Sequence, residues 1–280
     1  MIKKIKKALI KLYRIPQLTK WVAQANRSSH REKVGTNASQ VDLKCQRTLI
    51  IAPHSDDEFV GCFELMKKYG RLIDVFCVAL TGYENSPSNK RKRVNEFIAS
   101  AEKMNVNPFL PDDKGWEICL SNLIQENYGN VFIPSIVDWH WEHRLVSITV
   151  LNALLSASKE LNIYFYQVSA LIPGKYVNAY SIKTVEKWDI FFQLYSSQNY
   201  MPIQRFRISD KIYKNMGRRI EPYVQIDYNR IRSIIEKYNG IKAERFDDLK
   251  NSINDLDRIF VETNSLYEDL FLEEKDYYAR

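Results

Sequence analysis

The sequence predicts an α/β protein with a mostly parallel sheet, and two observations carry this prediction. Short apolar runs are each followed by a polar loop and then by a helical stretch, and this unit repeats along the chain. The 280 residues are 45% hydrophobic, which is enough apolar side chain to fill a core. No window reaches the roughly 18 uninterrupted apolar residues that a membrane-spanning helix needs. We therefore expect a soluble, globular protein.

Four strands and four helices are predicted in order along the chain. The strands are short apolar runs such as T-L-I-I-A, and they lie at 48–52, 74–80, 130–135 and 163–168. The helical stretches lie at 58–68, 90–104, 143–161 and 183–197. A polar loop at 81–89 separates the second strand from its helix. This alternation is typical of crossover connections between parallel strands.

Two terminal segments lie outside this alternation. Beyond residue 227, apolar residues recur in steps of four and three from Leu249 to Leu270, which marks one face of a helix. Such a stripe packs against its own chain more often than it pairs with a partner helix. Near the other end, the polar residues 26–44 predict a linker. The expected organisation is an arm and linker at 1–44, a central domain at 45–226 and a helical extension at 227–280.

The N-terminal stretch 2–13 predicts a basic amphipathic helix. One helical face carries Ile2, Ile5, Leu9 and Leu12 among lysines. Pro16 is expected to end or kink this helix, and basic residues interrupt the apolar stretch that a secretory signal needs. One interpretation is contact of residues 1–15 with an anionic membrane surface. The alternatives are docking on the protein's own body, a frayed arm and a transit peptide.

The net charge of +7 comes from this arm. Of the 41 Lys and Arg residues, nine lie in residues 1–31, which contain no acidic residue. The rest of the chain has 32 basic and 34 acidic residues and is close to neutral. A basic body that binds nucleic acid is therefore not indicated.

Several other classes of protein are excluded or disfavoured by missing motifs. The chain has no G-x-G dinucleotide fingerprint, no phosphate-binding loop and no G-x-S-x-G nucleophile elbow. Its four cysteines form no C-x-x-C pair, which favours a reducing, cytosolic compartment.

Three of the four histidines lie in two polar clusters that each follow a predicted strand. His54 belongs to A-P-H-S-D-D-E at 52–58, and His140 and His143 belong to D-W-H-W-E-H-R at 138–144. In an open parallel sheet, the loops at the carboxyl ends of the strands line the ligand crevice. We therefore expect the two clusters to meet there.

Adjacent carboxylates beside imidazoles suit a divalent cation such as zinc. His54 and Asp57 are three residues apart, so one tight turn can aim both at one ion, and His143 can supply a third ligand. Three protein ligands leave a position for water, as in catalytic rather than structural zinc sites. Asp56 is the candidate base for that water. His140 is the candidate to steady the oxyanion or to protonate the leaving amine.

Each cluster also has a purely structural interpretation. An Asp-Asp-Glu run is most often the N-cap and first turn of a helix, where acids suit the helix dipole, and Glu58 fits this pattern. His140 and His143 taken alone would be ordinary residues at a helix start. The two clusters together, with three of the four histidines, favour the metal site.

These clusters resemble the hallmarks of the PIG-L/LmbE-like family of metal-dependent N-acetyl-sugar deacetylases. Residues 53–58, P-H-S-D-D-E, are similar to the family's (P/A)-H-P-D-D-E, with Ser55 in place of proline. Residues 140–143, H-W-E-H, are similar to H-P-D-H, with Glu142 in the Asp position. Weaker similarities at 81–82, 93–106, 187–198 and 219–223 extend the resemblance over residues 47–224.

The resemblance implies a fold, a cofactor and residue roles. The fold is a Rossmann-like three-layer α/β sandwich, and the cofactor is one zinc ion or another divalent metal. The implied ligands are His54, Asp57 and His143. Asp56 would be the general base and His140 its partner at the oxyanion or leaving group. Arg93 would bind substrate, with solvation on a helix surface as the alternative, and Glu142 would orient His140.

The expected function is hydrolysis of the acetyl group from an N-acetylated amino sugar within a GlcNAc-type glycoconjugate, which releases acetate and a free amine. One alternative is a metal hydrolase of another amide. Another is a non-catalytic, membrane-associated scaffold, which the basic arm and the helical tail would suit. The expected partner is the sugar substrate, without nucleic acid. The expected location is the cytoplasm, with peripheral contact at the inner membrane face.

Overall fold

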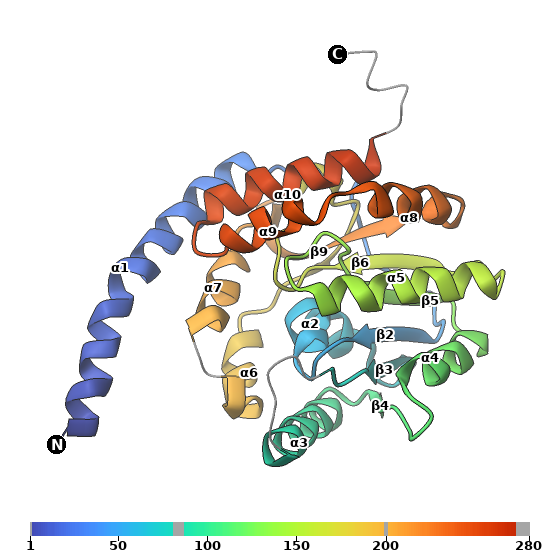
Figure 1. Ribbon diagram of the computed structural model, residues 1–280, viewed down its shortest axis with the longest axis horizontal. Coiled ribbons are helices and arrows are strands. Elements are labelled where there is room, and N and C mark those ends of the chain that lie inside the picture. Colours follow the sequence, from blue (N-terminus) through green and yellow to red (C-terminus); the bar gives the residue numbers. More distant parts are fainter. Residues whose placement is uncertain (1, 81–86, 199–200, 273–280) are drawn as a thin grey trace.

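The computed structural model describes the backbone of residues 2–80, 87–198 and 201–272, and the side chains of residues 15–80, 88–198 and 203–272. Most of the predicted loop at 81–89, with the similarity at 81–82, lies outside the described residues. Figure 1 shows a twisted central sheet with helices packed around it and the two terminal helical segments lying side by side.

The sheet has the mostly parallel character that the sequence predicts. Within the described residues its order is β1-β7-β9-β6-β5-β2-β3-β4, and β8 pairs with β9. Parallel pairing links β1 to β7 and connects β6, β5, β2, β3 and β4 in a row, whereas β9 runs antiparallel to its neighbours. The strands are Ser39–Gln40 (β1), Thr48–Ala52 (β2), Ile73–Cys77 (β3), Asn107–Phe109 (β4), Asn130–Pro134 (β5), Asn162–Tyr166 (β6), Ala179–Ile182 (β7), Lys214–Asn215 (β8) and Arg218–Ile226 (β9).

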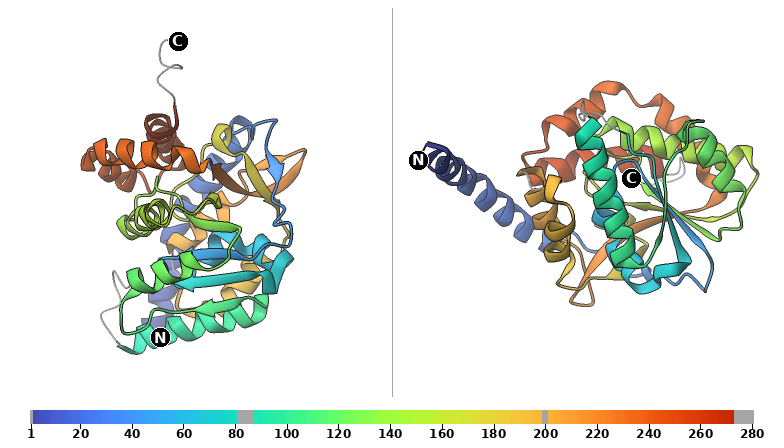
Figure 2. Two further views of the ribbon diagram at one scale, coloured as in Figure 1. Left: turned by 90° about the vertical axis from the view of Figure 1, so that its right-hand side faces the viewer. Right: turned by 90° about the horizontal axis from the view of Figure 1, so that it is seen from below.

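Helices cover both faces of the sheet and make three layers (Figure 2). Helices α2, α3 and α6 pack on one face, and α4, α5 and α8 to α10 pack on the other. The helices are Ile2–Arg31 (α1), Asp57–Tyr69 (α2), Pro87–Met104 (α3), Trp116–Gln125 (α4), Trp141–Ser156 (α5), Lys187–Leu194 (α6), Met201–Ser209 (α7), Ile231–Gly240 (α8), Ala243–Asn251 (α9) and Leu256–Phe271 (α10). The predicted α/β fold is therefore confirmed.

The predicted strands are all present, and the first agrees residue for residue with β2. The predicted helix at 143–161 is α5, which begins earlier and ends at Ser156. The predicted helix at 183–197 is shorter in the structure, because the chain leaves strand β7 only at Ile182 and α6 begins at Lys187. Strands β1, β4, β7, β8 and β9 and helices α4 and α7 were not predicted, whereas α8 lies in the predicted helical extension.

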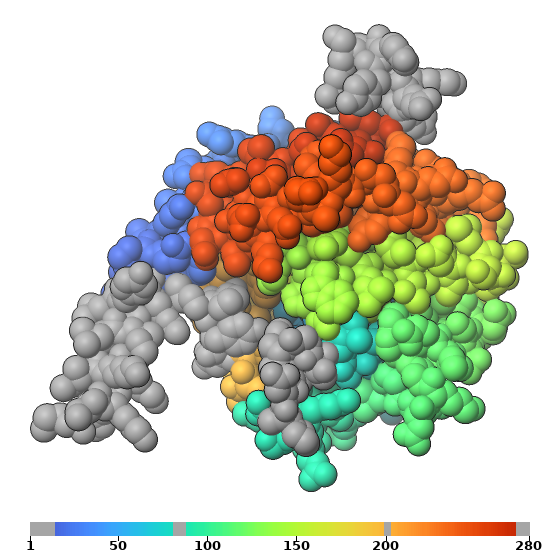
Figure 3. All heavy atoms as spheres, viewed as in Figure 1, coloured from blue at the N-terminus to red at the C-terminus, as the bar shows by residue number. Residues whose placement is uncertain are grey.

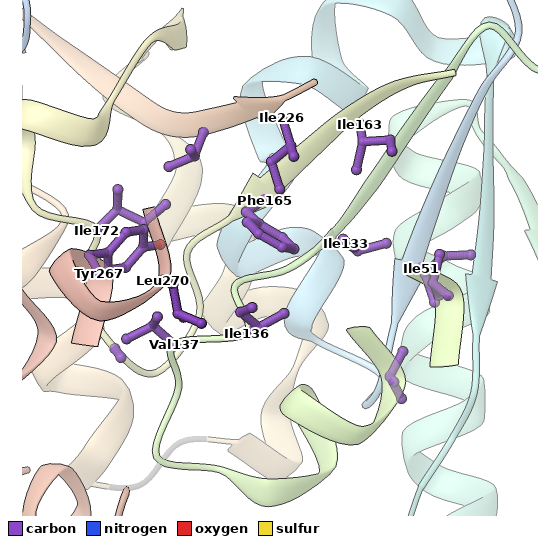
Figure 4. Close-up of a cluster of buried hydrophobic side chains, with 14 of the residues drawn as sticks. Ile51, Ile133, Ile136, Val137, Ile163, Phe165, Ile172, Ile226, Tyr267 and Leu270 are labelled. Carbon is purple, nitrogen blue, oxygen red and sulfur yellow. The ribbon is translucent and has the colours of Figure 1, made fainter. Parts of the chain in front are cut away.

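Every residue of β2 is buried, because both faces of the sheet are covered. Leu49 and Ile51 face the layer of α5 and α10, and Ile50 and Ala52 face the layer of α2. Figure 4 shows side chains of the central strands next to Tyr267 and Leu270 of α10. The helical extension is thus part of the main core.

Helix α1 differs from the predicted arm. It runs from Ile2 to Arg31 with Pro16 inside it, so the proline does not end the helix. Proline removes one backbone hydrogen bond, but here the following turns are held by packing against α7 and α10. The predicted linker at 26–44 is also partly wrong. It contains the end of α1, the short strand β1 and the buried side chains of Val41 and Leu43.

The apolar stripe from Leu249 to Leu270 belongs to two helices, α9 and α10, with a turn at 252–255 between them. Its side chains are buried against this chain, which confirms the own-chain interpretation. Figure 3 shows α9 and α10 in orange and red packed beside the blue second half of α1. None of the helices described by the structure is long and apolar enough to cross a membrane.

The fold has one switch point that places the candidate site. On one side of β2 the sheet continues with β3 and β4, and on the other side it continues with β5 and β6. The crossovers therefore diverge between β2 and β5, and such a divergence opens a crevice at the carboxyl ends of these strands. His54 follows β2, and His140 and His143 follow β5.

Candidate metal centre

The two histidine clusters meet at the switch point, as the sequence predicts. After β2, the chain makes a tight turn in which the N–H groups of Asp56 and Asp57 both donate to the carbonyl oxygen of His54. Helix α2 then begins at Asp57. After β5, a loop leads to His140, which is the N-cap of α5, and His143 lies in the first turn of that helix. Two loop-to-helix junctions therefore build the site.

Three polar atoms form a small triangle at the centre. The Nδ1 atom of His54 lies 3.0 Å from Oδ2 of Asp57 and 3.2 Å from Nε2 of His143. The third side, between Nε2 of His143 and Oδ2 of Asp57, is 3.3 Å. Ligands at about 2.0–2.2 Å from a tetrahedral zinc ion lie about 3.3–3.6 Å apart, so this triangle is only slightly smaller than three ligands of one ion require.

Carboxylates on the outer side hold the two imidazoles. Nδ1 of His143 lies 3.2 Å from Oδ2 of Asp138, and Nε2 of His54 lies 2.7 Å from Oε2 of Glu142. Asp138 is itself fixed by the N–H groups of His140 and Ser169. A carboxylate on the far nitrogen of a histidine orients the ring and raises its basicity as a metal ligand.

Glu142 therefore has a different partner from the one predicted. Its Oε2 atom is 3.7 Å from Nδ1 of His140, beyond a hydrogen bond, but 2.7 Å from Nε2 of His54. The additional methylene of glutamate relative to aspartate lets the carboxylate reach across to the other histidine cluster. Glu142 thus orients His54.

Asp56 stands beside the triangle and is held by Arg93 of α3. The Nη2 atom of Arg93 donates to Oδ1 of Asp56 at 3.0 Å, and both side chains are buried. Burial raises the pKa of Asp56 to about 6, against the lowering effect of Arg93. Solvation of Arg93 on a helix surface, the alternative in the sequence analysis, is therefore wrong.

The protonation of the triangle follows from its charges. Burial lowers the pKa of His143, but Asp57 and Asp138 outweigh it and raise the pKa to about 10. Burial also lowers the pKa of His54, and Asp57 again reverses the direction. Burial raises the pKa of Asp57, but the two histidines hold it well below its usual range. Without a cation, the buried carboxylates thus raise the pKa of both imidazoles and favour their protonated forms.

The negative charge around the two imidazoles is the structural test for a divalent cation. Four buried carboxylates surround the two imidazoles, namely Asp56, Asp57, Asp138 and Glu142. A bound metal ion needs neutral histidine ligands, so it would displace protons from the imidazoles and supply positive charge to the same carboxylates. The donor set therefore fits a divalent cation in distance, ligand type and charge.

His140 lies against both other histidines. Its ring centroid is 4.7 Å from that of His143 and 4.9 Å from that of His54. The three histidines offer ligand atoms within 4.8 Å of one another, so together they could hold a metal ion. Burial and then the two neighbouring histidines lower the pKa of His140 to about 4, and its Nδ1 atom has no hydrogen-bond partner among the described residues. His140 is therefore the neutral histidine of the cluster.

Glu58 lies in the first turn of α2, as its structural interpretation predicts, but its side chain is buried rather than solvated. The Tyr195 hydroxyl donates to Oε1 of Glu58. Burial raises the pKa of Glu58 to about 8. The Tyr195 hydroxyl, directly after α6, thus pairs with this buried carboxyl group.

A cavity of about 940 Å³ opens onto these residues. His54, Asp56, Asp57, His140 and His143 line its inner end. One side consists of Trp21 of α1, Arg205 and Phe206 of α7, and Ile253 and Asn254 of the turn before α10. We call these five residues the terminal wall. The cavity is large enough for a substrate of several sugar units, since ligand pockets measure about 300–1,000 Å³.

Hydrogen bonds to backbone oxygens hold the terminal wall together. Asn254 accepts from Gln17 at 2.9 Å and from the Trp21 ring at 3.1 Å. The buried Arg205 guanidinium donates to the carbonyl oxygens of Ile253 at 2.8 Å and Ser169 at 3.0 Å. Segments more than two hundred residues apart in the sequence therefore meet at the cavity.

Sequence reasoning missed two parts of the site. Asp138 lies inside the quoted run D-W-H-W-E-H-R, so its position two residues before His140 was a usable signal. The terminal wall gave no such signal, because a tryptophan, an arginine and an asparagine in helical context are ordinary residues. The structure brings together all six predicted site residues, including Arg93, which contacts Asp56 beside the triangle.

No protein-family model and no curated protein matches this chain. The chain is, however, similar to solved structures. GalB, the 4-carboxy-2-hydroxymuconate hydratase from Pseudomonas putida KT2440, is similar with a TM-score of 0.52 and 12% identity, over 64% of this chain and 96% of that chain. The conserved protein TT1542 from Thermus thermophilus has a TM-score of 0.47 and 16% identity, over 64% and 94%. A deacetylase of the teicoplanin biosynthetic pathway has a TM-score of 0.46 and 17% identity, over 65% and 99%.

The likeness to GalB shows a shared fold over about two-thirds of this chain. It is an α/β fold with a mostly parallel sheet, and the two histidine clusters lie at its switch point. The chain therefore combines the fold that the PIG-L/LmbE-like resemblance implies with both motifs on which that resemblance rests.

Proposed function

We propose that this protein is a metal-dependent hydrolase that removes the acetyl group from an N-acetylated amino sugar. The observation that carries the proposal is the triangle of His54, Asp57 and His143 beside Asp56 at the inner end of a large cavity. Three ligands at these distances leave the fourth position of a zinc-like ion free for substrate or water. The two motifs in this geometry support the PIG-L/LmbE-like assignment.

The proposed ligands of a divalent ion, zinc or another metal, are His54, Asp57 and His143. The tighter triangle favours this set over the three histidines, since Asp57 lies within 3.3 Å of both its partners. A cation bound there would polarise the acetamide carbonyl and lower the pKa of water. Asp138 and Glu142 would hold the two imidazoles in the ligating orientation.

The remaining steps belong to side chains of this protein. Asp56, with its raised pKa of about 6, takes a proton from the attacking water and returns it to the nitrogen of the leaving amine. Arg93 keeps that carboxylate pointed at the triangle. His140, which is neutral, donates an N–H hydrogen bond to the oxygen that gains negative charge.

The test is acetate release from N-acetylglucosamine and from its β-1,4-linked dimer and trimer, measured after loading with zinc. We expect acetate and free amine in equal amounts, and none after chelation or with Asp56→Asn. An N-acetylated peptide is the parallel substrate for hydrolysis of another amide. Because GalB shows that this fold also carries a hydratase, the products must be identified. Turnover of peptide alone, or water addition without acetate, would overturn the proposal.

We also propose that residues 1–15 contact an anionic membrane surface, which places the enzyme at the inner face of the membrane in the cytoplasm. The first half of α1 extends away from the body of the protein, as Figures 1 and 2 show. A basic amphipathic helix in that position suits anionic lipid headgroups. Deletion of residues 1–14 spares Gln17 and Trp21, which hold the terminal wall. We expect this deletion to abolish binding to vesicles that contain phosphatidylglycerol and to leave hydrolysis of soluble substrates unchanged.

A further inference from the structure

Helix α2, which carries Asp57 in its first turn, is not a regular helix. Cys62 has φ −132° and ψ 22°, so the helix is kinked one turn after it begins. In a regular helix the N–H of residue 64 donates to the C=O of residue 60 across this position. A kink there requires other partners for these two groups, since buried backbone groups are almost always paired.

A buried ion pair supplies both partners. Nζ of Lys187 donates to the carbonyl oxygen of Val60 at 2.6 Å, and Oε2 of Glu221 accepts from the N–H of Glu64 at 3.1 Å. Lys187 and Glu221 contact each other at 2.8 Å, and the side chains of both are at most 3% exposed. The Lys187–Glu221 ion pair thus takes the place of the helix hydrogen bond between the N–H of Glu64 and the C=O of Val60.

The position of the kink is set by close packing. Gly61 lies on the ring of Tyr166, where a Cβ atom would be only 2.1 Å from a ring carbon. Tyr166 is anchored to the sheet, because its hydroxyl donates to the carbonyl oxygen of Ile51 in β2 at 2.7 Å. The helix can approach the sheet this closely only at a glycine, and the ion pair closes its backbone at the same turn.

We propose that Lys187 and Glu221 are positioning residues that fix the first turn of α2, and with it Asp56 and Asp57, at the cation site. The N–H of Val60 donates to the carbonyl oxygen of Asp56 at 2.9 Å, and its carbonyl oxygen accepts from Lys187. Val60 therefore links Asp56 of the site to the Lys187–Glu221 ion pair through its two backbone groups. This inference rests on the proposed metal-dependent function, and it assigns a role to two residues that do not touch the reacting atoms.

A neighbouring pair provides a matched control. Lys183 lies in the same buried network and binds Asp210 at 2.8 Å, but neither residue has a hydrogen bond to the described residues of α2. Lys187→Met/Glu221→Gln and Lys183→Met/Asp210→Asn each convert one buried lysine and its acid into a neutral pair. Removing both charges avoids leaving one of them buried without a partner, so both proteins are expected to fold.

The first measurement is zinc affinity, determined by competition with a chelator in the absence of substrate. We expect Lys187→Met/Glu221→Gln to bind zinc about 10- to 100-fold more weakly than the wild type, as losses in the outer shell of a metal site do. The control variant should stay within about twofold of the wild type while losing a comparable amount of thermal stability. Equal affinity in the two variants would overturn the positioning role.

The second measurement is amide hydrogen exchange over residues 57–64 in the protein without metal. We expect exchange in this segment to be faster in Lys187→Met/Glu221→Gln than in the control, with other helices unchanged. This readout needs neither zinc nor a substrate. A wild type that binds no zinc would therefore contradict the proposed function, whereas unchanged exchange would contradict the positioning of α2.

Discussion

The inner end of the cavity and the terminal wall are built in opposite ways. The inner end consists of buried charged side chains that come from two loops at neighbouring strand ends, and these side chains contact one another directly. The terminal wall consists of side chains from α1, α7 and the turn before α10, which are joined mainly through backbone oxygens. The difference predicts separate effects: changes at the inner end alter chemistry, and changes in the wall alter the fit of the substrate.

The same contrast appears in exposure. Side chains of the triangle are at most 5% exposed, whereas the salt bridges Lys20–Asp255 and Arg27–Asp257, which join α1 to the start of α10, are between 37% and 52% exposed. Exposed pairs contribute about 0–1 kcal/mol each. Helices α1 and α10 are therefore attached mainly by apolar packing of residues such as Trp21 and Leu256. The exposed ion pairs orient the two helices relative to each other.

Asp56→Asn is the change with the largest expected effect. The amide keeps the size of the side chain and a contact with Arg93, but it accepts no proton from water. We expect kcat to fall by about 10²- to 10⁴-fold, the usual contribution of a general base, with zinc content and folding unchanged. Acetate release and metal analysis on the same preparation measure both. A fully active variant would remove Asp56 from the mechanism.

His143→Ala and His140→Ala separate the two possible ligand sets. If His54, Asp57 and His143 hold the ion, His143→Ala loses stoichiometric zinc while His140→Ala retains it. His140→Ala should then lower kcat by about 10²-fold or more through loss of a hydrogen bond to the oxyanion. Metal analysis after dialysis decides the matter. Loss of zinc in both variants would instead favour the three-histidine site.

The inner end could be predicted from the sequence because its residues are close together along the chain. His54, Asp56 and Asp57 share one turn, and His140 and His143 share another. One topological rule, that the strand ends of a parallel sheet form the crevice, then joins the two turns. The partner of Glu142 was mispredicted, because the choice between His54 and His140 depends on side-chain geometry to within about an ångström.

The wall and the attachment of the termini could not be predicted in this way. The contact between Trp21 and Asn254 links residues that only the packed fold brings together. Local rules also did not predict the length of α1, because proline often ends a helix but Pro16 lies within one that runs to Arg31. Tertiary packing on α7 and α10 outweighs that local preference, and no short-range pattern reports such packing.

Trp21→Phe tests the wall with a smaller effect. The substitution removes the hydrogen bond to the carbonyl oxygen of Asn254, which contributes about 0.5–1.5 kcal/mol, and leaves a smaller ring against the cavity. We expect KM for a trimeric sugar to rise by up to about tenfold, with kcat and zinc content unchanged. KM for the monosaccharide is the internal control, because one sugar unit fills only part of the cavity. A change in kcat alone would show that the wall acts on the chemistry.

Asp255→Asn is expected to have the smallest effect, and it tests the exposed attachment of the termini. Asp255 is the N-cap of α10 and accepts from the N–H of Arg258, and an asparagine oxygen can keep that hydrogen bond. The change removes the charge that faces Lys20 and the hydrogen bond that Lys20 donates to Oδ2. At neutral pH we therefore expect a loss of at most about 1 kcal/mol of unfolding free energy, as for other exposed pairs.

The pH dependence of this difference is the sharper measurement. The hydrogen bond from Lys20 lowers the pKa of Asp255 in the folded protein, whereas burial acts weakly in the other direction. A lowered folded pKa stabilises the protein above the unfolded value of about 3.9 and ceases to do so as the pH falls through the folded value. The difference in unfolding free energy between wild type and Asp255→Asn should thus be full at about pH 6 and shrink below about pH 4. A difference that stays constant down to about pH 2 would mean that the charge of Asp255 does not hold α1 against α10.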